Sequence, residues 1–272
     1  MDYKTMQPLL SIITVTYNAE KELEKTIKSI ISQENINDLN VEYIIQDGMS
    51  KDGTLSLAKG YRESIEGKNI SFSIYSEKDF GIYDAMNRGI KKATGKWICL
   101  LNAGDVFCNE KSITGIKSNL EESVSDVLYA DYRRVNLYME RTIKIPEIKE
   151  LRNTMIFCHQ SVFIRDYVYS RYSYDCKYDL VADYDLMLRL YLNKCNFEYM
   201  PICLVNYDTD GLSGKNMIET YREIYKVRKN NNVINRKFRE HIRYMAGILK
   251  RFILASMPQN LRWIIYKKLK GL

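Results

Sequence analysis

Short apolar runs alternate with amphipathic stretches through the first part of the chain. Residues 9–16 (LLSIITVT) form a β-branched run of strand length, and apolar positions after Asn18 recur at helical spacing. Further strands are predicted at 41–45, 70–75 and 97–101. One helix is predicted to start near Thr54, and another is predicted to end near Ala93. This β-α-β-α-β-α-β series predicts a mainly parallel α/β sheet with helices on both faces.

The second part of the chain gives more mixed signals. Strands are predicted at 127–132, 160–164 and 197–205, and residues 181–195 read as a helix with two aspartates in its first turn. Beyond Lys215 the pattern is helical and basic. We therefore predict one α/β domain over residues 1–214 and a helical tail over residues 215–272.

The net charge of +7 hides a strong asymmetry between these regions. Residues 215–272 contain fifteen Lys or Arg and three Glu, a local charge of +12, so residues 1–214 carry −5. A mildly acidic body with a basic tail argues against a nucleic-acid-binding protein. The six cysteines form no CxxC pair, and neither a signal peptide nor an apolar stretch of about 20 residues is evident. These features predict a cytoplasmic, reduced protein.

An acidic turn, Asn102-Ala103-Gly104-Asp105, follows the strand predicted at 97–101. Open α/β sheets place ligand chemistry at the carboxyl edge of their strands, where Asp105 could hold a divalent cation and, through it, a diphosphate. The same composition also suits a plain tight turn. As a turn residue, Asp105 is expected to be exposed.

Two other acidic turns, at residues 47–52 and 79–84, are expected to converge on the same edge. Asp47 could accept a hydrogen bond from a base or ribose, whereas Asp52 to Thr54 is better explained as a turn and helix cap. Neither a Walker A lysine nor a Gly-x-Gly-x-x-Gly motif is present, so the sequence supports neither a P-loop enzyme nor a typical dinucleotide binder.

Several segments together resemble the inverting family-2 glycosyltransferases, especially those that build bacterial surface polysaccharides. In order, they are SIITVTYNAEKELEKTIKSIISQ, IIQDGMSKDGT, SEKDFGIYDAMNRGIKKATGKWICLLNAGD, HQSVF and ADYDLMLRL. The resemblance runs from about Leu10 to Gly214. It implies a GT-A fold, a nucleotide-sugar donor (a UDP-sugar), Mn²⁺ or Mg²⁺, and sugar transfer with inversion.

The resemblance also assigns donor-binding positions. Residues that match the loops beside the nucleotide or the donor are Thr16, Tyr17, Asn18, Asp47, Asp79, Tyr83 and Asn87. The family's Asp-x-Asp metal motif keeps only its last acid here, which leaves Asp105 as the metal ligand, with Asn102 and Gly104 beside the donor. Met86 stands where many relatives carry a basic residue near the diphosphate.

Asp183 matches the family's general base, which must face the anomeric carbon opposite the leaving diphosphate. Asp185 competes for that role, and either aspartate could instead simply balance the helix dipole. His159 matches a segment that borders the acceptor and metal pocket, although a lone histidine before a strand is more often structural. The 208–213 loop (DTDGLS) resembles a segment that closes over the donor in relatives, or is simply a solvent loop.

Two other functions fit the sequence less well. A nucleotidyltransferase would have a glycine-rich, basic loop after the first strand, and Tyr17 to Glu20 is not one. A non-catalytic nucleotide-sugar-binding scaffold would explain the incomplete metal motif. The expected acceptor is a glycan or a polyprenyl-diphosphate-linked glycan.

The basic tail shows apolar residues at spacings of three and four beside a basic face, with Pro258 separating two predicted amphipathic helices. Such helices could lie on an anionic membrane surface, which would place the protein peripherally at the inner face of the cytoplasmic membrane. They could equally pack on the α/β domain or form a homodimer with a second copy of the chain.

Overall fold

The computed structural model describes residues 7–136, 139–208, 216–234, 245–247 and 249. Contacts divide the chain into two units, Met1–Asp210 and Gly211–Leu272. The first unit holds every candidate site residue named above, so its architecture decides how the site is built.

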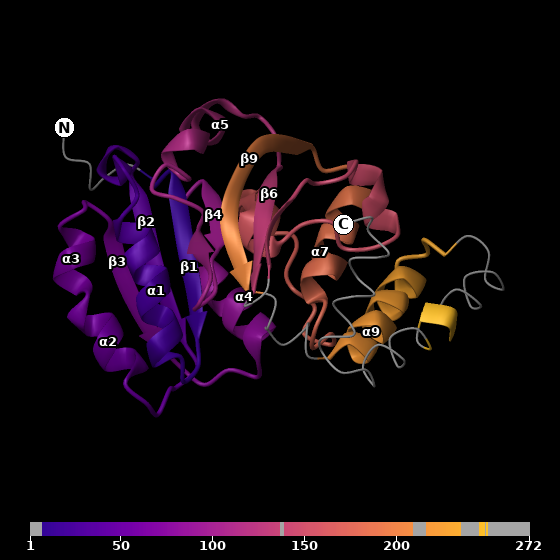
Figure 1. The fold of residues 1–272 in the computed structure, drawn as a ribbon, viewed down its shortest axis with the longest axis horizontal. Coiled ribbons are helices and arrows are strands. Elements are labelled where there is room, and N and C mark those ends of the chain that lie inside the picture. Colours follow the sequence, from indigo (N-terminus) through magenta and orange to yellow (C-terminus); the bar gives the residue numbers. More distant parts are fainter. Residues whose placement is uncertain (1–6, 137–138, 209–215, 235–244, 248, 250–272) are drawn as a thin grey trace. The chain divides into compact units, whose positions relative to one another are not determined.

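The first unit is built around one large mixed sheet (Figure 1). Its described strands follow the spatial order β3-β2-β1-β4-β8-β6-β9-β5, and β7 pairs with β6. β3, β2, β1 and β4 are mutually parallel, as are β6 and β9, whereas β8 runs antiparallel to both β4 and β6. The strands are β1 (Leu10–Thr16), β2 (Val41–Asp47), β3 (Ser71–Ser76), β4 (Trp97–Leu100), β5 (Val106–Phe107), β6 (Val127–Asn136), β7 (Met139–Ile143), β8 (Val162–Arg165) and β9 (Phe197–Asp208).

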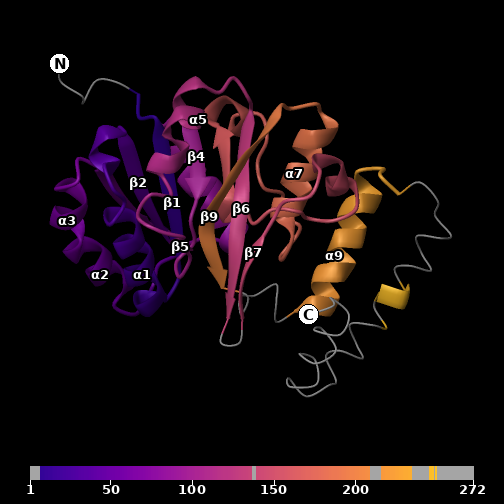
Figure 2. The same ribbon diagram turned by 45° about the horizontal axis from the view of Figure 1, so that its top comes forward.

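Helices connect these strands and cover the sheet (Figure 2). The α-helices of this unit are α1 (Glu20–Ile31), α2 (Thr54–Gly60), α3 (Arg62–Glu66), α4 (Ile82–Lys92), α5 (Lys117–Glu122), α6 (Asp166–Tyr169) and α7 (Ala182–Leu192). Short 3-10 turns occupy Ile36–Asp38, Thr114–Ile116, Ile148–Arg152 and His159–Ser161.

Alternate residues of the parallel strands pack against helices on opposite faces, as the pleat requires. Leu10 and Ile12 of β1 share a buried cluster with Leu23 and Ile27 of α1. Ile13 points to the other face, where a Cβ on Gly89 of α4 would lie 2.7 Å from the Ile13 Cγ2 atom. The two faces explain why β1 reads as a continuous apolar run rather than an alternating one.

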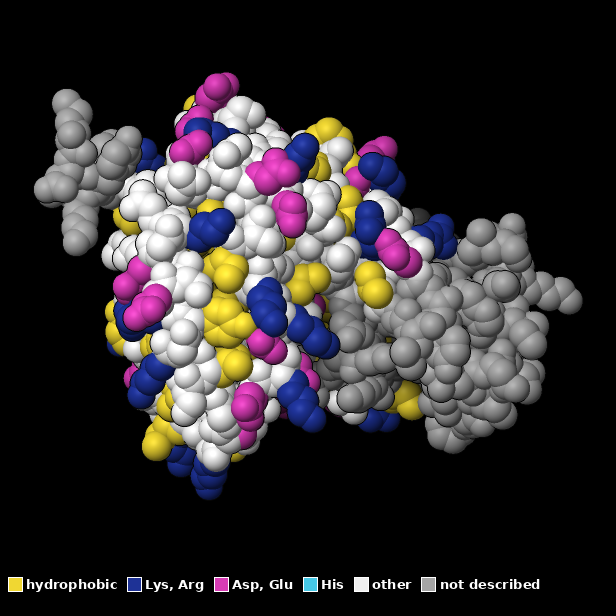
Figure 3. Space-filling model, turned by 60° about the vertical axis from the view of Figure 1, so that its left-hand side comes forward, with side chains coloured by type: hydrophobic (Ala, Val, Ile, Leu, Met, Phe, Trp, Pro, Cys, Tyr) yellow, Lys and Arg dark blue, Asp and Glu magenta, His cyan; other side chains and the backbone are white. Residues whose placement is uncertain are grey.

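β3 forms one edge of the sheet, and cationic side chains cover its apolar residues. The Arg62 guanidinium lies 5.1 Å from the Phe72 ring centroid and donates a hydrogen bond to the Phe72 carbonyl. Lys92 lies 4.6 Å from the centroid of the Tyr75 ring. On the side of the molecule that Figure 3 brings forward, acidic and basic side chains are interspersed among small groups of apolar side chains. Covered and charged edges discourage unwanted strand pairing.

The predicted elements agree with the structure in kind over most of the first unit, with three differences. The first helix begins at Glu20 rather than Asn18, because Asn18 adopts a left-handed backbone with φ of 48°. The predicted strand at 160–164 begins at Val162, since the preceding residues His159–Ser161 form a 3-10 turn. The two-residue β5, the polar β7 and the short helices α5 and α6 were not predicted.

In the second unit, α9 (Met217–Asn230) agrees with the helix predicted beyond Lys215. The 209–213 part of the predicted closing loop and most of the predicted amphipathic tail lie outside the described residues. None of the described helices is long and apolar enough to cross a membrane. The division of the chain into a catalytic domain and a tail at residue 214 stays a prediction.

Candidate active site

The turn after β4 is held in place by a polar residue of α1. The backbone N–H of Asp105 donates to the Asn102 carbonyl at 3.0 Å, and Gly104 adopts a positive φ of 98°, which favours glycine. The Thr26 hydroxyl accepts the Gly104 N–H at 2.9 Å and lies 2.9 Å from the Asp105 carbonyl, to which it donates. Thr26 is fully buried within the apolar face of α1, so its hydrogen bonds fix the turn to this helix.

Asp105 is buried, not exposed as the turn composition predicted: its relative exposure is 8%. Gln160 packs over the turn and donates its amide N–H to Asp105 Oδ2 at 2.5 Å. The other end of the Gln160 amide accepts a hydrogen bond from the Cys158 thiol at 2.6 Å. Burial and the Asp105 charge both raise the pKa of Cys158, so this thiol stays neutral.

His159 connects the same turn to α7. Its Nε2 atom lies 3.0 Å from the amide nitrogen of Asn102, and its Nδ1 atom lies 3.4 Å from Asp183 Oδ2. The 3-10 turn directly before β8 therefore presents two consecutive side chains to the site. His159 reaches Asn102 and Asp183, and Gln160 reaches Asp105.

Asp183 lies in the first turn of α7 and remains partly accessible, with 19% of its side chain exposed. Its Oδ1 atom accepts the Tyr184 N–H at 2.8 Å and the Tyr83 hydroxyl at 3.3 Å. Burial, reinforced by the Asp183 charge, raises the pKa of Tyr83 well above its usual value. The phenol is therefore a protonated donor that holds the carboxylate from the α4 side.

Asp185, the alternative to Asp183, has a different environment. Its side chain is 3% exposed, and Oδ2 pairs with Arg189 Nε at 2.7 Å, one helical turn further along α7. Arg189 also donates to the Ser173 carbonyl at 2.7 Å. This pair fastens α7 to a neighbouring loop and leaves little of the Asp185 carboxylate accessible to a substrate.

Asp47 joins the ends of three parallel strands. It is fully buried, and its two oxygens accept hydrogen bonds from the hydroxyls of Thr16 (3.0 Å), Ser50 (2.5 Å) and Ser76 (2.7 Å) and from the Ser50 N–H (3.0 Å). Asn18 joins the same loops, because its N–H donates to Ser50 Oγ at 2.8 Å. In this arrangement the Asp47 carboxylate organises the loops that the sequence resemblance predicts to lie beside the donor.

Tyr17 and Asp79 both approach Gly48. A Cβ on Gly48 would lie 3.4 Å from the Tyr17 ring and would collide with the Asp79 carboxylate, so a larger residue here would force the Asp79 side chain to move. Tyr17 is 63% exposed. Asp79 Oδ1 accepts the Gly81 N–H at 3.0 Å. An open aromatic ring beside a carboxylate suits a flat ligand that carries an N–H group.

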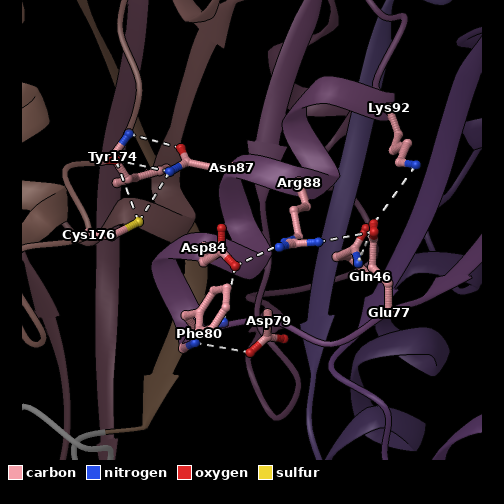
Figure 4. A network of polar contacts seen from close by, with 11 residues as sticks. Gln46, Glu77, Asp79, Phe80, Asp84, Asn87, Arg88, Lys92, Tyr174 and Cys176 are labelled. Atoms are coloured by element: carbon pink, nitrogen blue, oxygen red, sulfur yellow. Dashed lines mark hydrogen bonds and ion pairs between the residues drawn. The ribbon is translucent and has the colours of Figure 1, made fainter.

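Charged side chains around the first turn of α4 bond to one another and to the backbone (Figure 4). Asp84 accepts the Phe80 N–H at 3.1 Å and the Arg88 Nε–H at 2.9 Å, and Arg88 also reaches Glu77 at 3.1 Å. The hydrogen bond to Asp84 raises the pKa of Arg88. Met86, at the position where relatives carry a basic residue, is fully buried.

Asn87, predicted to lie beside the donor, is engaged by the backbone. Its amide donates to the Tyr174 carbonyl at 2.9 Å and accepts the Tyr174 N–H at 3.0 Å (Figure 4). The Tyr174 ring stacks on Tyr83 with centroids 5.5 Å apart. In this structure, Asn87 therefore holds Tyr174 in place against the Tyr83 ring.

The structure thus gathers the predicted residues into two groups. One contains the turn of residues 102–105 after β4 (the candidate metal turn), His159, Tyr83 and Asp183, and the other contains the loops after β1, β2 and β3. Thr26 and Gln160 contribute to the site and were not predicted. A polar residue inside the apolar stripe of α1 is the available signal for Thr26, whereas Gln160 lies in a segment whose pattern predicts a strand.

Comparisons with known proteins identify the family of the chain. The sequence model for Glycosyl transferase family 2 matches residues 11–174. A PGL/p-HBAD biosynthesis glycosyltransferase of Mycobacterium bovis is 30% identical over 209 residues, which cover 75% of this chain and 78% of the relative.

Two solved structures share the fold. S. aureus TarS 1–349 in complex with UDP-GlcNAc superposes with a TM-score of 0.61 and 18% identity, covering 82% of this chain and 66% of TarS 1–349. The mannosyltransferase PcManGT from Pyrobaculum calidifontis, in complex with GDP-Man and Mn²⁺, gives a TM-score of 0.65 and 13% identity, with coverage of 98% and 81%. These likenesses confirm the predicted GT-A-type α/β sheet.

Proposed function

The chain belongs to glycosyl transferase family 2, and we propose that it moves one sugar from a UDP-sugar to a hydroxyl of a glycan or lipid-linked glycan, with inversion at the anomeric carbon. The family assignment makes the chain a glycosyltransferase and sets aside the nucleotidyltransferase alternative. The observation that carries the proposal is the pair His159 and Gln160, which link the candidate base Asp183 to the candidate metal turn.

The surroundings of Tyr17 support a uracil nucleotide. The exposed Tyr17 ring offers a stacking surface, and the Asp79 carboxylate beside it can accept the imide N–H of uracil. Asp47 acts on the nucleotide through the loops it organises, or directly if a ribose hydroxyl replaces one of its serine partners. TarS and PcManGT carry different nucleotides in their complexes, so the argument for UDP rests on these side chains.

The metal turn fits Mn²⁺ or Mg²⁺. Asp105 supplies a carboxylate, and Asn102 Oδ1 is a buried acceptor with no hydrogen-bond partner among the described residues. No three His, Cys, Asp or Glu side chains gather into a metal-binding group within the described chain. A cation here would therefore need substrate phosphates and water beside its one or two protein ligands. When bound, it would neutralise charge on the departing diphosphate.

Asp183 is the proposed general base. The acceptor oxygen bonds to the anomeric carbon, the bond from that carbon to the diphosphate breaks, and the hydroxyl proton passes to Asp183. The accessibility of Asp183 supports this role over Asp185, whose carboxylate is buried against Arg189. Tyr83 and the Tyr184 N–H fix the Asp183 carboxylate, so little reorientation is needed as the proton moves.

Replacing Asp105 tests the proposed donor and metal binding. Asp105→Asn keeps the shape and one hydrogen-bond acceptor but removes the charge. We expect it to lose Mn²⁺-dependent binding of UDP-sugars in calorimetry, and with it transfer, while it stays folded. The control is Asp38→Asn, which changes an exposed aspartate outside the site. Unchanged Mn²⁺-dependent affinity in Asp105→Asn would contradict the assignment, and binding without turnover by the unmodified chain would favour the non-catalytic scaffold.

We further propose that the basic tail brings the enzyme to an anionic membrane surface, where a polyprenyl-diphosphate-linked acceptor would lie. The support comes from the sequence: residues 236–272 combine basic side chains with apolar positions at helical spacing. The alternative, a homodimer formed through the tail, is separated from membrane binding by the sedimentation experiment described in the Discussion.

A further inference from the structure

Among the described residues, each ring nitrogen of His159 has one polar neighbour. Nε2 faces the Asn102 amide nitrogen at 3.0 Å, and Nδ1 faces Asp183 Oδ2 at 3.4 Å. An amide NH₂ group can only donate, so Nε2 accepts in this arrangement. The ring N–H is then on Nδ1, which faces Asp183. The 3.4 Å separation is longer than a usual N–H···O bond, as catalytic contacts often are before substrate binds.

The orientation of Asn102 therefore decides the tautomer of His159. The Asn102 side chain has one donor end, directed to His159, and one acceptor end, the buried Oδ1 without a described partner. A cation in the metal turn would attract the carbonyl end, and this would keep the NH₂ end on His159. Occupation of the turn and the direction of the His159 N–H would thus be linked through one rigid amide group.

The contacts of Asp183 single out one of its oxygens as the reactive atom. Oδ1 already accepts hydrogen bonds from the Tyr184 N–H and the Tyr83 hydroxyl. Oδ2 has His159 as its one described neighbour, so it keeps a lone pair for an incoming hydroxyl. A donor at His159 Nδ1 would fix the direction of that lone pair.

We propose that Asn102, His159 and Asp183 form a hydrogen-bonded chain through which an occupied metal turn orients the base, with Asp183 Oδ2 as the atom that takes the proton. His159 is then a positioning residue, since it acts on the acceptor only through Asp183. The inference rests on the proposed function, because it takes Asp183 as the base and Asn102 as part of the metal turn.

Three substitutions at His159 separate its two contacts. His159→Asn keeps an N–H donor at the same number of bonds from Cα as Nδ1 and loses the Nε2 contact. His159→Gln keeps an amide at the Nε2 position and loses the donor at Nδ1, whereas His159→Ala removes both. The control is His241→Ala, which replaces the other histidine of the chain, outside the described residues.

Two measurements on the full chain are combined: steady-state transfer with Mn²⁺, and calorimetric binding of UDP-sugar with Mn²⁺, in which each His159 variant should stay within about threefold of the unmodified chain. We expect His159→Ala to lower kcat about 10- to 100-fold, as loss of an orienting group typically does, with the KM for donor changed less than about threefold. His159→Asn should recover about tenfold of the loss, and His159→Gln should not. In the His159→Ala background, Asn102→Ala should lower kcat less than it does in the unmodified chain, because only its contribution to the metal turn is left to lose.

Several outcomes would overturn the inference. The inference fails if His159→Ala has a kcat within twofold of the unmodified chain, or if it raises the donor KM at constant kcat. It also fails if His159→Gln recovers activity instead of His159→Asn, or if the losses in kcat of His159→Ala and Asn102→Ala are fully additive. Loss of transfer in Asp183→Asn without any effect of the His159 substitutions would leave the proposed function intact and reject only this chain of contacts. Retention of transfer in Asp183→Asn would reject both.

Discussion

Replacing Asp183 by asparagine removes the proposed base with little change of shape. The Asn Oδ1 atom can still accept the Tyr184 N–H at 2.8 Å and the Tyr83 hydroxyl at 3.3 Å. At the Oδ2 position, however, an NH₂ group would face the His159 Nδ1 atom, now 3.4 Å from that oxygen. Two donors would then oppose each other, so one charge-assisted contact is lost and the site loses its proton acceptor.

The expected losses follow from these contacts. Without general base catalysis the transfer rate should fall roughly 10²- to 10⁴-fold, which corresponds to about 3–5 kcal/mol in the activation barrier. The free energy of unfolding should fall by only about 1 kcal/mol, or about 2–4 °C in melting temperature for a domain of this size. Donor affinity should stay within a few-fold, because Asp183 lies outside the metal turn.

The assay combines initial rates at saturating UDP-sugar, calorimetric donor binding and thermal unfolding. Asp185→Asn is the matched comparison, two residues along the same helix. Because the Asp185 side chain is 3% exposed and pairs with Arg189, this change should lower stability by about 1.5–3 kcal/mol and leave transfer within tenfold. A folded, donor-binding Asp183→Asn variant that retains transfer within tenfold would refute the assignment. If Asp185→Asn lost transfer instead, the base would be Asp185.

Two other predictions concern packing and location. Gly89→Ala places a Cβ 2.7 Å from the buried Ile13 Cγ2 atom. The cost of overpacking, roughly 1–3 kcal/mol, should exceed the gain in helix propensity of about 1 kcal/mol. The free energy of unfolding measured in denaturant titrations should therefore fall. The control Gly60→Ala, with nothing within 4 Å of the added Cβ, should be neutral or stabilising, and equal losses in both variants would contradict the packing argument. The full chain should sediment with anionic liposomes at low salt, whereas a chain ending at Asn235 should not. If the full chain instead dimerises with increasing concentration and does not sediment with the liposomes, the tail forms a homodimer rather than a membrane contact.

The parallel part of the sheet could be predicted because its strands are continuous apolar runs. β1, β2 and β4 are buried along almost their whole length, and their sequences LSIITVT, VEYIIQD and WICL are accordingly rich in apolar residues. β7 and β5 carry no such signal, since the first is largely polar and the second has only two residues. The position of β8 between β4 and β6 depends on contacts between residues far apart in sequence, which no local pattern encodes.

The candidate residues could be named from the sequence, but their contacts could not. Sequence resemblance pointed to Asp105, His159 and Asp183, with Asp185 as the alternative base. The structure adds a physical reason to prefer Asp183, because the fold buries Asp185 and places Arg189 against its carboxylate. Gln160 was missed because a glutamine inside an apparent strand carries no chemistry until the 3-10 turn aims it at Asp105.

The buried Asp47 carboxylate has a consequence for protein engineering. None of the described groups that hydrogen-bond to it is cationic, so the fold keeps a charge away from water with only hydroxyl and amide donors around it. In Asp47→Asn, the hydroxyls of Thr16 and Ser50 could rotate to accept hydrogen bonds, and the charge would be gone. Directed evolution for heat resistance alone should therefore drift away from aspartate at this position, whereas selection for sugar transfer should retain it.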